Sequence, residues 1–123
     1  MTLSPDLLAE LKQSIAGSVR TDLASRILYS TDASIYQIEP LGVVIPRDQH
    51  DLQAVVELAA KYKTPILPRG SGSSLAGQAV GEALIVDVSR WLDRIIEVDP
   101  EARTATVEPG VILATAHTAS PRR

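Results

Sequence analysis

One stretch of the chain is dense in glycine and serine, and these residue types suit the binding of an anion. It follows a short apolar run, residues 64–67, and reads Pro68-Arg69-Gly70-Ser71-Gly72-Ser73-Ser74-Leu75-Ala76-Gly77-Gln78. Its small side chains leave backbone N–H groups free to converge on an anion, with hydroxyls beside them. A loop of this kind after a strand predicts a cradle for a diphosphate, and therefore a nucleotide-type cofactor. A loop that binds nothing is the alternative.

Two common phosphate-binding motifs do not fit the spacing of this stretch. Gly72 and Gly77 have the interval of a P-loop, but a glutamine and an alanine follow where that motif needs lysine and then serine or threonine. Gly70 and Gly72 match the start of a Rossmann fingerprint, but Leu75 stands where its third glycine belongs. The stretch therefore belongs to neither class.

The elements that must position the stretch have a strand–helix–strand pattern. Residues 42–45 form a β-branched strand that Pro46 ends, and residues 65–67 form a second strand, parallel to the first because a helix connects them. Asp48 is the predicted N-cap of the intervening helix, and Asp51 complements the positive end of its dipole. The apolar face of that helix comprises Leu52, Val55, Val56, Ala59 and Ala60.

The rest of the chain predicts a third strand and a hairpin. Residues 83–88 are almost continuously apolar, which is typical of a strand buried on both faces. Residues 94–98 and 104–107 alternate apolar and polar side chains around a polar turn, as an antiparallel hairpin does. The expected fold class is therefore α+β, a small mixed parallel and antiparallel sheet with flanking helices.

Two helices are predicted before the first strand. The first has Ser4 as N-cap and Pro5 in its first turn, and Gly17 is its expected stop. The second starts at residues 21–22 and extends to residue 28 or 29. A polar segment that ends in Pro40 follows and is the expected boundary. The predicted organisation is a helical leader (1–39), a main module (40–111) and a divergent or truncated tail (112–123).

Composition narrows the function classes for this chain of 123 residues. The formal net charge is -3 without a basic stripe, which argues against nucleic acid as a partner. The chain has no cysteine, no signal peptide pattern and no apolar run long enough for a membrane span, so we expect a cytoplasmic location. We expect His50 to be a solvated surface residue and assign no catalytic or metal-binding role to it or to His117.

Four motifs, in order, resemble the FAD-linked oxidase family of the vanillyl-alcohol oxidase type, whose module is also called the PCMH-type FAD-binding domain. They are Pro40 to Pro46, Pro68 to Gln78, Leu84 to Arg90, and Val107-Glu108-Pro109-Gly110-Val111, with a helix like the family's first at residues 48–62. The closest likeness is to glycolate oxidase flavoprotein subunits and D-lactate dehydrogenases. The resemblance implies the N-terminal lobe of that module and FAD as the cofactor.

The resemblance also implies which residues contact FAD. Gly70 to Ser74 would bind the diphosphate, and Gly77 and Gln78 would lie near the isoalloxazine end. Arg69 would pair with a phosphate or, equally, be solvated at the loop entrance. Asp87 is expected to end its strand with backbone hydrogen bonds. Serine and glycine at the relevant positions exclude covalent attachment through a histidine there. The full expected set is Arg69, Gly70, Ser71, Gly72, Ser73, Ser74, Leu75, Gly77, Gln78, Pro109 and Gly110.

The implied function is the FAD-binding lobe of a flavin-dependent dehydrogenase or oxidase of 2-hydroxy acids, incomplete and inactive alone. Relatives enclose FAD between two lobes and carry substrate-binding residues in a further domain, whereas the tail after Val111 departs from their pattern. The alternative is a non-catalytic chain that associates with a separately encoded second lobe or with an iron–sulfur subunit. An open sheet edge would also allow self-association.

Overall fold

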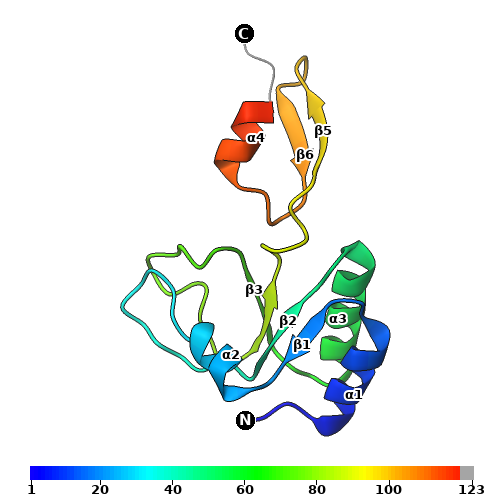
Figure 1. Ribbon diagram of the computed structural model, residues 1–123, viewed down its shortest axis with the longest axis vertical. Helices are drawn as coiled ribbons and strands as arrows, with labels where there is room; N and C mark the ends of the chain where they lie inside the picture. Colours follow the sequence, from blue (N-terminus) through cyan, green and yellow to red (C-terminus); the bar gives the residue numbers. More distant parts are fainter. Residues whose placement is uncertain (120–123) are drawn as a thin grey trace.

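The computed structural model describes residues 1–119, and its centre is a four-stranded sheet (Figure 1). The strands are β1 (Ser18–Arg20), β2 (Gly42–Ile45), β4 (Leu84–Asp87) and β3 (Ile66–Arg69), in that spatial order. β1 is antiparallel to β2, whereas β2, β4 and β3 are parallel to one another. The predicted third strand therefore lies between the first two, with both neighbours parallel to it. All four of its residues are buried, as its apolar sequence predicts.

Helices cover one face of this sheet and a tyrosine covers part of the other. α1 (Pro5–Ser14) and α3 (Gln49–Lys61) bury leucines and valines against Val44, Leu84 and Val86. Tyr29 packs on the opposite face. Alternation of side chains along β2 and β4 explains the division, because successive residues point to opposite faces. The residues of that opposite face are Val43, Ile45 and Ile85.

The start of α3 carries a buried carboxylate that accepts three backbone hydrogen bonds. Asp48 caps the helix, as predicted, by accepting the N–H of Asp51 at 2.8 Å. Asp51 is itself buried and accepts the N–H groups of Ala16, Gly17 and Arg47 at 2.8–2.9 Å. Burial alone would raise the pKa of Asp51, but these three donors hold it below its ordinary value. The residue therefore joins three segments and does more than complement a helix dipole.

The leader differs from its prediction in three details. Ser4 occupies the N-cap position of α1, but its side chain makes no capping hydrogen bond. The helix ends at Ser14, before Gly17, and a methyl group on Gly17 would lie 2.0 Å from the Ile45 carbonyl oxygen. Gly17 thus permits close approach to β2. The short strand β1 was not predicted, because three residues of mixed polarity give no periodic signal.

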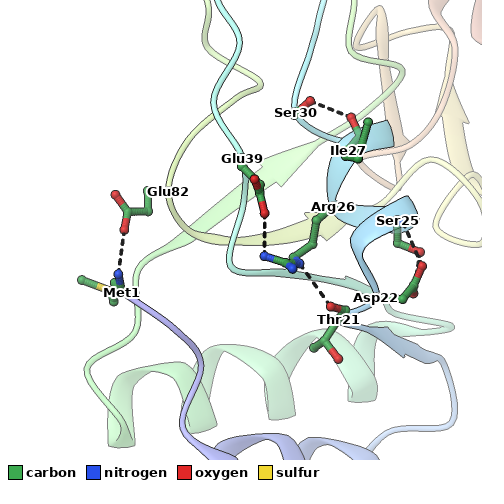
Figure 2. A network of polar contacts seen from close by, with 9 residues as sticks. All are labelled: Met1, Thr21, Asp22, Ser25, Arg26, Ile27, Ser30, Glu39 and Glu82. Carbon is green, nitrogen blue, oxygen red and sulfur yellow. Dashed lines mark hydrogen bonds and ion pairs between the residues drawn. The ribbon is translucent and has the colours of Figure 1, made fainter.

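α2 (Leu23–Leu28) leads into the connector loop, which we define as residues 30–39. Figure 2 shows Asp22 capping this helix and Arg26 donating to the Thr21 carbonyl at 3.2 Å and to Glu39 at 2.6 Å. Ser30 donates its hydroxyl proton to the Ile27 carbonyl at 2.6 Å. The end of α2 therefore holds both ends of the connector loop.

The predicted hairpin forms a separate two-stranded sheet, seen above the main sheet in Figure 1. Its strands are β5 (Ile95–Asp99) and β6 (Thr104–Val107), and α4 (Leu113–Ala119) follows without any buried residue. Residues 120–123 of the predicted tail lie outside the described residues. Within residues 1–119, none of the helices is both long and apolar enough to cross a membrane.

Candidate functional site

A cavity of about 570 Å³ lies at the carboxyl ends of β3 and β4. Parallel strands commonly place ligand sites at this edge, because the loops that follow the strands converge there. Two separate segments line most of the cavity, residues 68–74 and residues 109–113. Further lining comes from Gln78, Ala79, Ser89, Asp93 and Thr115. The structure thus brings the glycine–serine loop, defined here as residues 70–78, beside the Pro109–Gly110 segment that the sequence predicted for the same site.

The glycine–serine loop presents hydrogen-bond donors that no other described residue uses. β3 extends to Arg69, so the predicted loop starts two residues later than expected, at Gly70. From Gly70 to Ser74, none of the backbone N–H groups or serine hydroxyls bonds to another residue in the described range 1–119. Five consecutive free donors at a cavity suit an anion with several oxygens, such as a diphosphate.

Glycine occurs at three positions of this loop for different physical reasons. Gly72 and Gly77 have φ angles of 76° and 83°, which strongly favour glycine. Gly70 has no left-handed φ, and a methyl group there would meet nothing within 4 Å. Its backbone instead borders open space in the cavity. The fold therefore requires glycine at 72 and 77, whereas at 70 the missing side chain only leaves room for a ligand.

Arg69 supports the loop from inside. Its guanidinium donates to the carbonyls of Ala79 at 3.1 Å and Tyr29 at 3.4 Å, and its carbon Cζ lies 5.2 Å from the centre of the Tyr29 ring. A methyl group on Gly72 would lie 2.4 Å from Arg69 Nη2. Arg69 is half-buried and also lines the cavity, where it is the only positively charged residue of the lining. Its structural contacts with Ala79 and Tyr29 were not predicted from the sequence.

Beneath the loop, Asp87 ends β4 with side-chain and backbone hydrogen bonds. It accepts the Tyr29 hydroxyl at 2.5 Å and both the N–H and the hydroxyl of Ser89 at 2.9 and 2.6 Å. Burial, together with the bond to Asp87, raises the pKa of Tyr29 to about 12. Asp87 does not line the cavity, so the network fixes the strand end from which the site is built.

The second wall of the cavity, which we call the distal wall, comprises residues 109–115. Gly110 joins it to the segment that follows β4: its N–H donates to the Leu92 carbonyl at 2.6 Å, and a methyl group there would lie 2.1 Å from the Val88 carbonyl oxygen. Sequence reasoning identified Pro109 and Gly110 but missed several residues of the lining. Among these, Asp93, Ile112, Leu113 and Thr115 lie outside the four motifs, whereas Ser89 lies within the motif Leu84 to Arg90 but was not assigned to the site.

Two of the expected site residues lie outside the cavity lining. Leu75 is 82% exposed at the far side of the loop, and Gly77 lies under the ring of Tyr36. Gln78 does line the cavity, with its side-chain oxygen accepting the Ala76 N–H at 3.2 Å. A contact between FAD and any of these residues stays a prediction.

The neighbouring carboxylates and histidine at the start of α3 form the one cluster with metal-ligand spacing in the described residues. Asp48, His50 and Asp51 each place one ligand atom within 4.8 Å of the others. Asp51 already accepts three backbone N–H groups and Asp48 caps the helix. The cap and the buried acceptor account for the cluster without a cation.

Comparisons with known proteins agree with this geometry. The chain is 44% identical over 111 residues to D-2-hydroxyglutarate dehydrogenase of Escherichia coli K12, covering 87% of this chain and 11% of that protein. It is 38% identical over 91 residues to glycolate oxidase subunit GlcD of Bacillus subtilis 168, covering 72% of this chain and 19% of that protein. The chain therefore spans less than a fifth of the length of either relative.

Solved structures share the fold. A structure of alkyldihydroxyacetonephosphate synthase aligns with a TM-score of 0.77 at 23% identity, covering 95% of this chain and 26% of that one. Substrate-bound p-cresol methylhydroxylase aligns with a TM-score of 0.78 at 21% identity, covering 92% of this chain and 23% of that one. The predicted fold, an α+β lobe of the PCMH type, is confirmed. A family model described as "FAD binding domain" matches residues 40–122, and the chain belongs to that family.

Proposed function

We propose that the chain is the FAD-binding lobe of a flavin-dependent dehydrogenase or oxidase of 2-hydroxy acids, and that Gly70 to Ser74 bind the diphosphate of FAD. The observation that carries the proposal is the row of free donors at the cavity, next to the open space over Gly70. Arg69 adds a positive charge at the same edge. When bound, FAD supplies two-electron oxidation chemistry, and this chain's residues hold and orient it.

The proposed substrate class rests on the relatives. D-2-hydroxyglutarate and glycolate, in the names of two relatives, are both 2-hydroxy acids. The cavity lining contains neither histidine nor lysine, and Asp93 is its only carboxylate. We therefore assign no general base here and expect the 123-residue chain alone to give no turnover with glycolate, D-lactate or D-2-hydroxyglutarate and an artificial electron acceptor. Flavin-dependent turnover with any of the three acids would contradict this expectation.

A fluorescence titration of FAD with a Gly70→Val variant tests the diphosphate site. A Cβ at residue 70 meets no atom within 4 Å, so we expect the fold to accept valine there, while its methyl groups occupy the space over the loop backbone. We expect FAD affinity to fall at least about tenfold while the melting temperature stays unchanged. Ala105→Val, which enlarges an exposed residue of β6 outside the cavity, is the matched control. Unchanged FAD affinity in Gly70→Val would refute the assignment.

A second candidate role is association with a separately encoded second lobe or an iron–sulfur subunit. The position of β3 favours it, because this strand lies at the edge of the main sheet and pairs only with β4 among the described residues. Light scattering of the purified chain, with and without FAD, tests for an exposed pairing edge. We expect concentration-dependent self-association, and a monomer at all concentrations would argue against this role.

A further inference from the structure

We propose that the connector loop, residues 30–39, holds the glycine–serine loop in its FAD-binding shape, with Asp32 as the central positioning residue. This inference rests on the proposed function, because it takes the glycine–serine loop as the diphosphate site. The connector loop lies outside residues 40–122, which the family model matches, so that match assigns it no role. Its contribution follows from contacts within this chain.

The connector loop is closed at its base. The Ile38 N–H donates to the Ser30 carbonyl at 2.9 Å, and Thr31 and Gln37 form an isolated antiparallel bridge. Arg26 holds Glu39 at 2.6 Å from the neighbouring helix (Figure 2). A loop whose ends are fixed in this way has less conformational entropy to lose when its tip makes contacts. The tip, residues 32–36, can therefore serve as a fixed support.

Three contacts join this tip to the glycine–serine loop and its end. The Ala33 N–H donates to the Gly72 carbonyl at 2.9 Å. The Ala79 N–H donates to Asp32 Oδ2 at 3.2 Å. The Tyr36 ring covers Gly77, where a methyl group would lie 2.7 Å from ring atom Cδ2. The contacts are spread from the first half of the loop to its end, and Figure 1 shows the two loops side by side at the left of the sheet.

Asp32 is the residue that ties the two loops together through a charged group. Its Oδ1 accepts the Ser34 N–H at 2.9 Å, which fixes the side chain within its own loop. The Ser34 side chain, followed by the backbone N–H groups of Ser34 and Ala79, holds the pKa of Asp32 below its ordinary value. The carboxylate is therefore ionised at neutral pH, next to a loop that we propose binds an anion.

This charge makes the positioning role testable, because two effects of removing it have opposite signs. An anion beside a diphosphate is repulsive, so electrostatics alone predicts tighter FAD binding when Asp32 becomes alanine. Loss of the support predicts weaker binding, because the free donors of Gly70 to Ser74 no longer converge. Weaker binding therefore cannot come from the change of charge.

The experiment compares Asp32→Ala, Asp32→Asn and the control Asp6→Ala, which removes an exposed acid from α1. FAD affinity is measured by fluorescence, and backbone order parameters of residues 70–79 by ¹⁵N relaxation without FAD. We expect Asp32→Ala to weaken FAD binding about tenfold and to lower the order parameters from about 0.85 to below 0.6. Asp32→Asn, which keeps an acceptor oxygen, should recover part of both, and Asp6→Ala should match the wild type.

The outcomes separate this inference from the proposed function. Equal or tighter FAD binding by Asp32→Ala, or a glycine–serine loop that stays rigid in it, overturns the positioning role and leaves the FAD site standing. A wild-type chain that does not bind FAD contradicts the proposed function, and the order parameters still decide the role of the connector loop. Should Asp32→Ala fail to fold, Tyr36→Ala gives the same two measurements, since it removes only a half-exposed ring from Gly77.

Discussion

The two walls of the cavity are built in different ways. The residues that flank the glycine–serine loop contact residues far away in the sequence: Ala79 bonds to Asp32, 47 positions earlier, and Arg69 bonds to the Tyr29 carbonyl, 40 positions earlier. The distal wall relies on nearer residues. Gly110 bonds to Leu92, Val111 bonds to Glu108, and neither β6 nor α4 contains a buried residue.

This difference shows which part of the site the chain fixes by itself. The loop that carries the free donors is supported by the connector loop at Gly72, Gly77 and Ala79, so we expect it to keep its shape without a ligand. The distal wall approaches the segment after β4 closely at Gly110. Elements with few buried contacts open at lower free energy than the core, so we expect the distal wall to be the more dynamic half of the site.

The largest expected effect comes from the close backbone approach of the distal wall at Gly110. In Gly110→Ala, the new methyl group would lie 2.1 Å from the Val88 carbonyl oxygen and 2.6 Å from that of Leu92. Both neighbours are backbone, so the wall must move away, at a cost of about 3 kcal/mol. We expect NMR shifts of residues 105–115 to change and FAD binding to weaken, whereas residues 43–45 and 84–86 keep their shifts.

Gly70→Ala is the matched control for this variant, because a methyl group at residue 70 meets no protein atom. Its unfolding free energy should equal that of the wild type or exceed it by up to about 1 kcal/mol, because alanine restricts the unfolded chain more than glycine does. If Gly110→Ala also left the shifts of the distal wall unchanged, the wall would not depend on this contact and the contrast between the walls would fail.

Asp51→Asn tests the three hydrogen bonds that the Asp51 carboxylate accepts at the start of α3, on the face of the main sheet that the helices cover. Asparagine offers one acceptor oxygen where the carboxylate serves three N–H donors, so we expect a loss of about 2 kcal/mol in urea unfolding. The folded-state pKa of Asp51 lies below its ordinary value of 3.8. Its contribution is therefore present above that value and is lost as the pH falls through the lower folded pKa.

The pH dependence gives this variant its own control. The difference between wild type and Asp51→Asn should be full near neutral pH and should shrink below about pH 4. A difference that stayed constant down to the acid-unfolding range would show that the carboxylate's charge is not what the three donors recognise.

Tyr29→Phe should have a smaller effect, because it removes one hydrogen bond and leaves Asp87 bonded to Ser89. We expect a loss of about 1 kcal/mol. The pKa of Tyr29 is raised from 10.0 to about 12, so its contribution is present below 10.0 and is lost as the pH rises through about 12. Tyrosinate absorbance should lose its last titration step in this variant, and an unchanged curve would place that step on another tyrosine.

The sequence predicted the elements with a clear period and missed those fixed by tertiary contacts. β2 and the second strand of the hairpin have the predicted bounds, and α3 has the predicted cap, because apolar patterning and capping are local properties. β1 and the inward contacts of Arg69 were missed, because a short mixed strand and a half-buried arginine give no local signal.

The candidate site likewise has one part that could be predicted from the sequence and one that could not. The donors of Gly70 to Ser74 and the Pro109–Gly110 segment could be predicted, since small residues and an ordered set of motifs stand in the sequence itself. The supporting role of Asp32, Ala33 and Tyr36 could not, because it depends on which distant loop folds against them. Contacts between two irregular loops that are distant in the sequence produce no periodic pattern of apolar residues.

The smallest expected effect concerns the contact between Glu108 and Arg94, next to the distal wall. Glu108 Oε1 accepts the Arg94 N–H at 3.1 Å and lies 3.6 Å from that residue's Nε, but the Arg94 side chain is 75% exposed. Glu108→Gln keeps the oxygen that accepts the N–H and removes only the charge. Solvent reaches the arginine of this pair, although the Glu108 side chain is only 16% exposed, so we expect a change below about 0.5 kcal/mol that disappears in high salt. Urea unfolding at low and high salt measures it. A loss above about 1 kcal/mol would mean that an ion pair helps Gly110 to hold the distal wall.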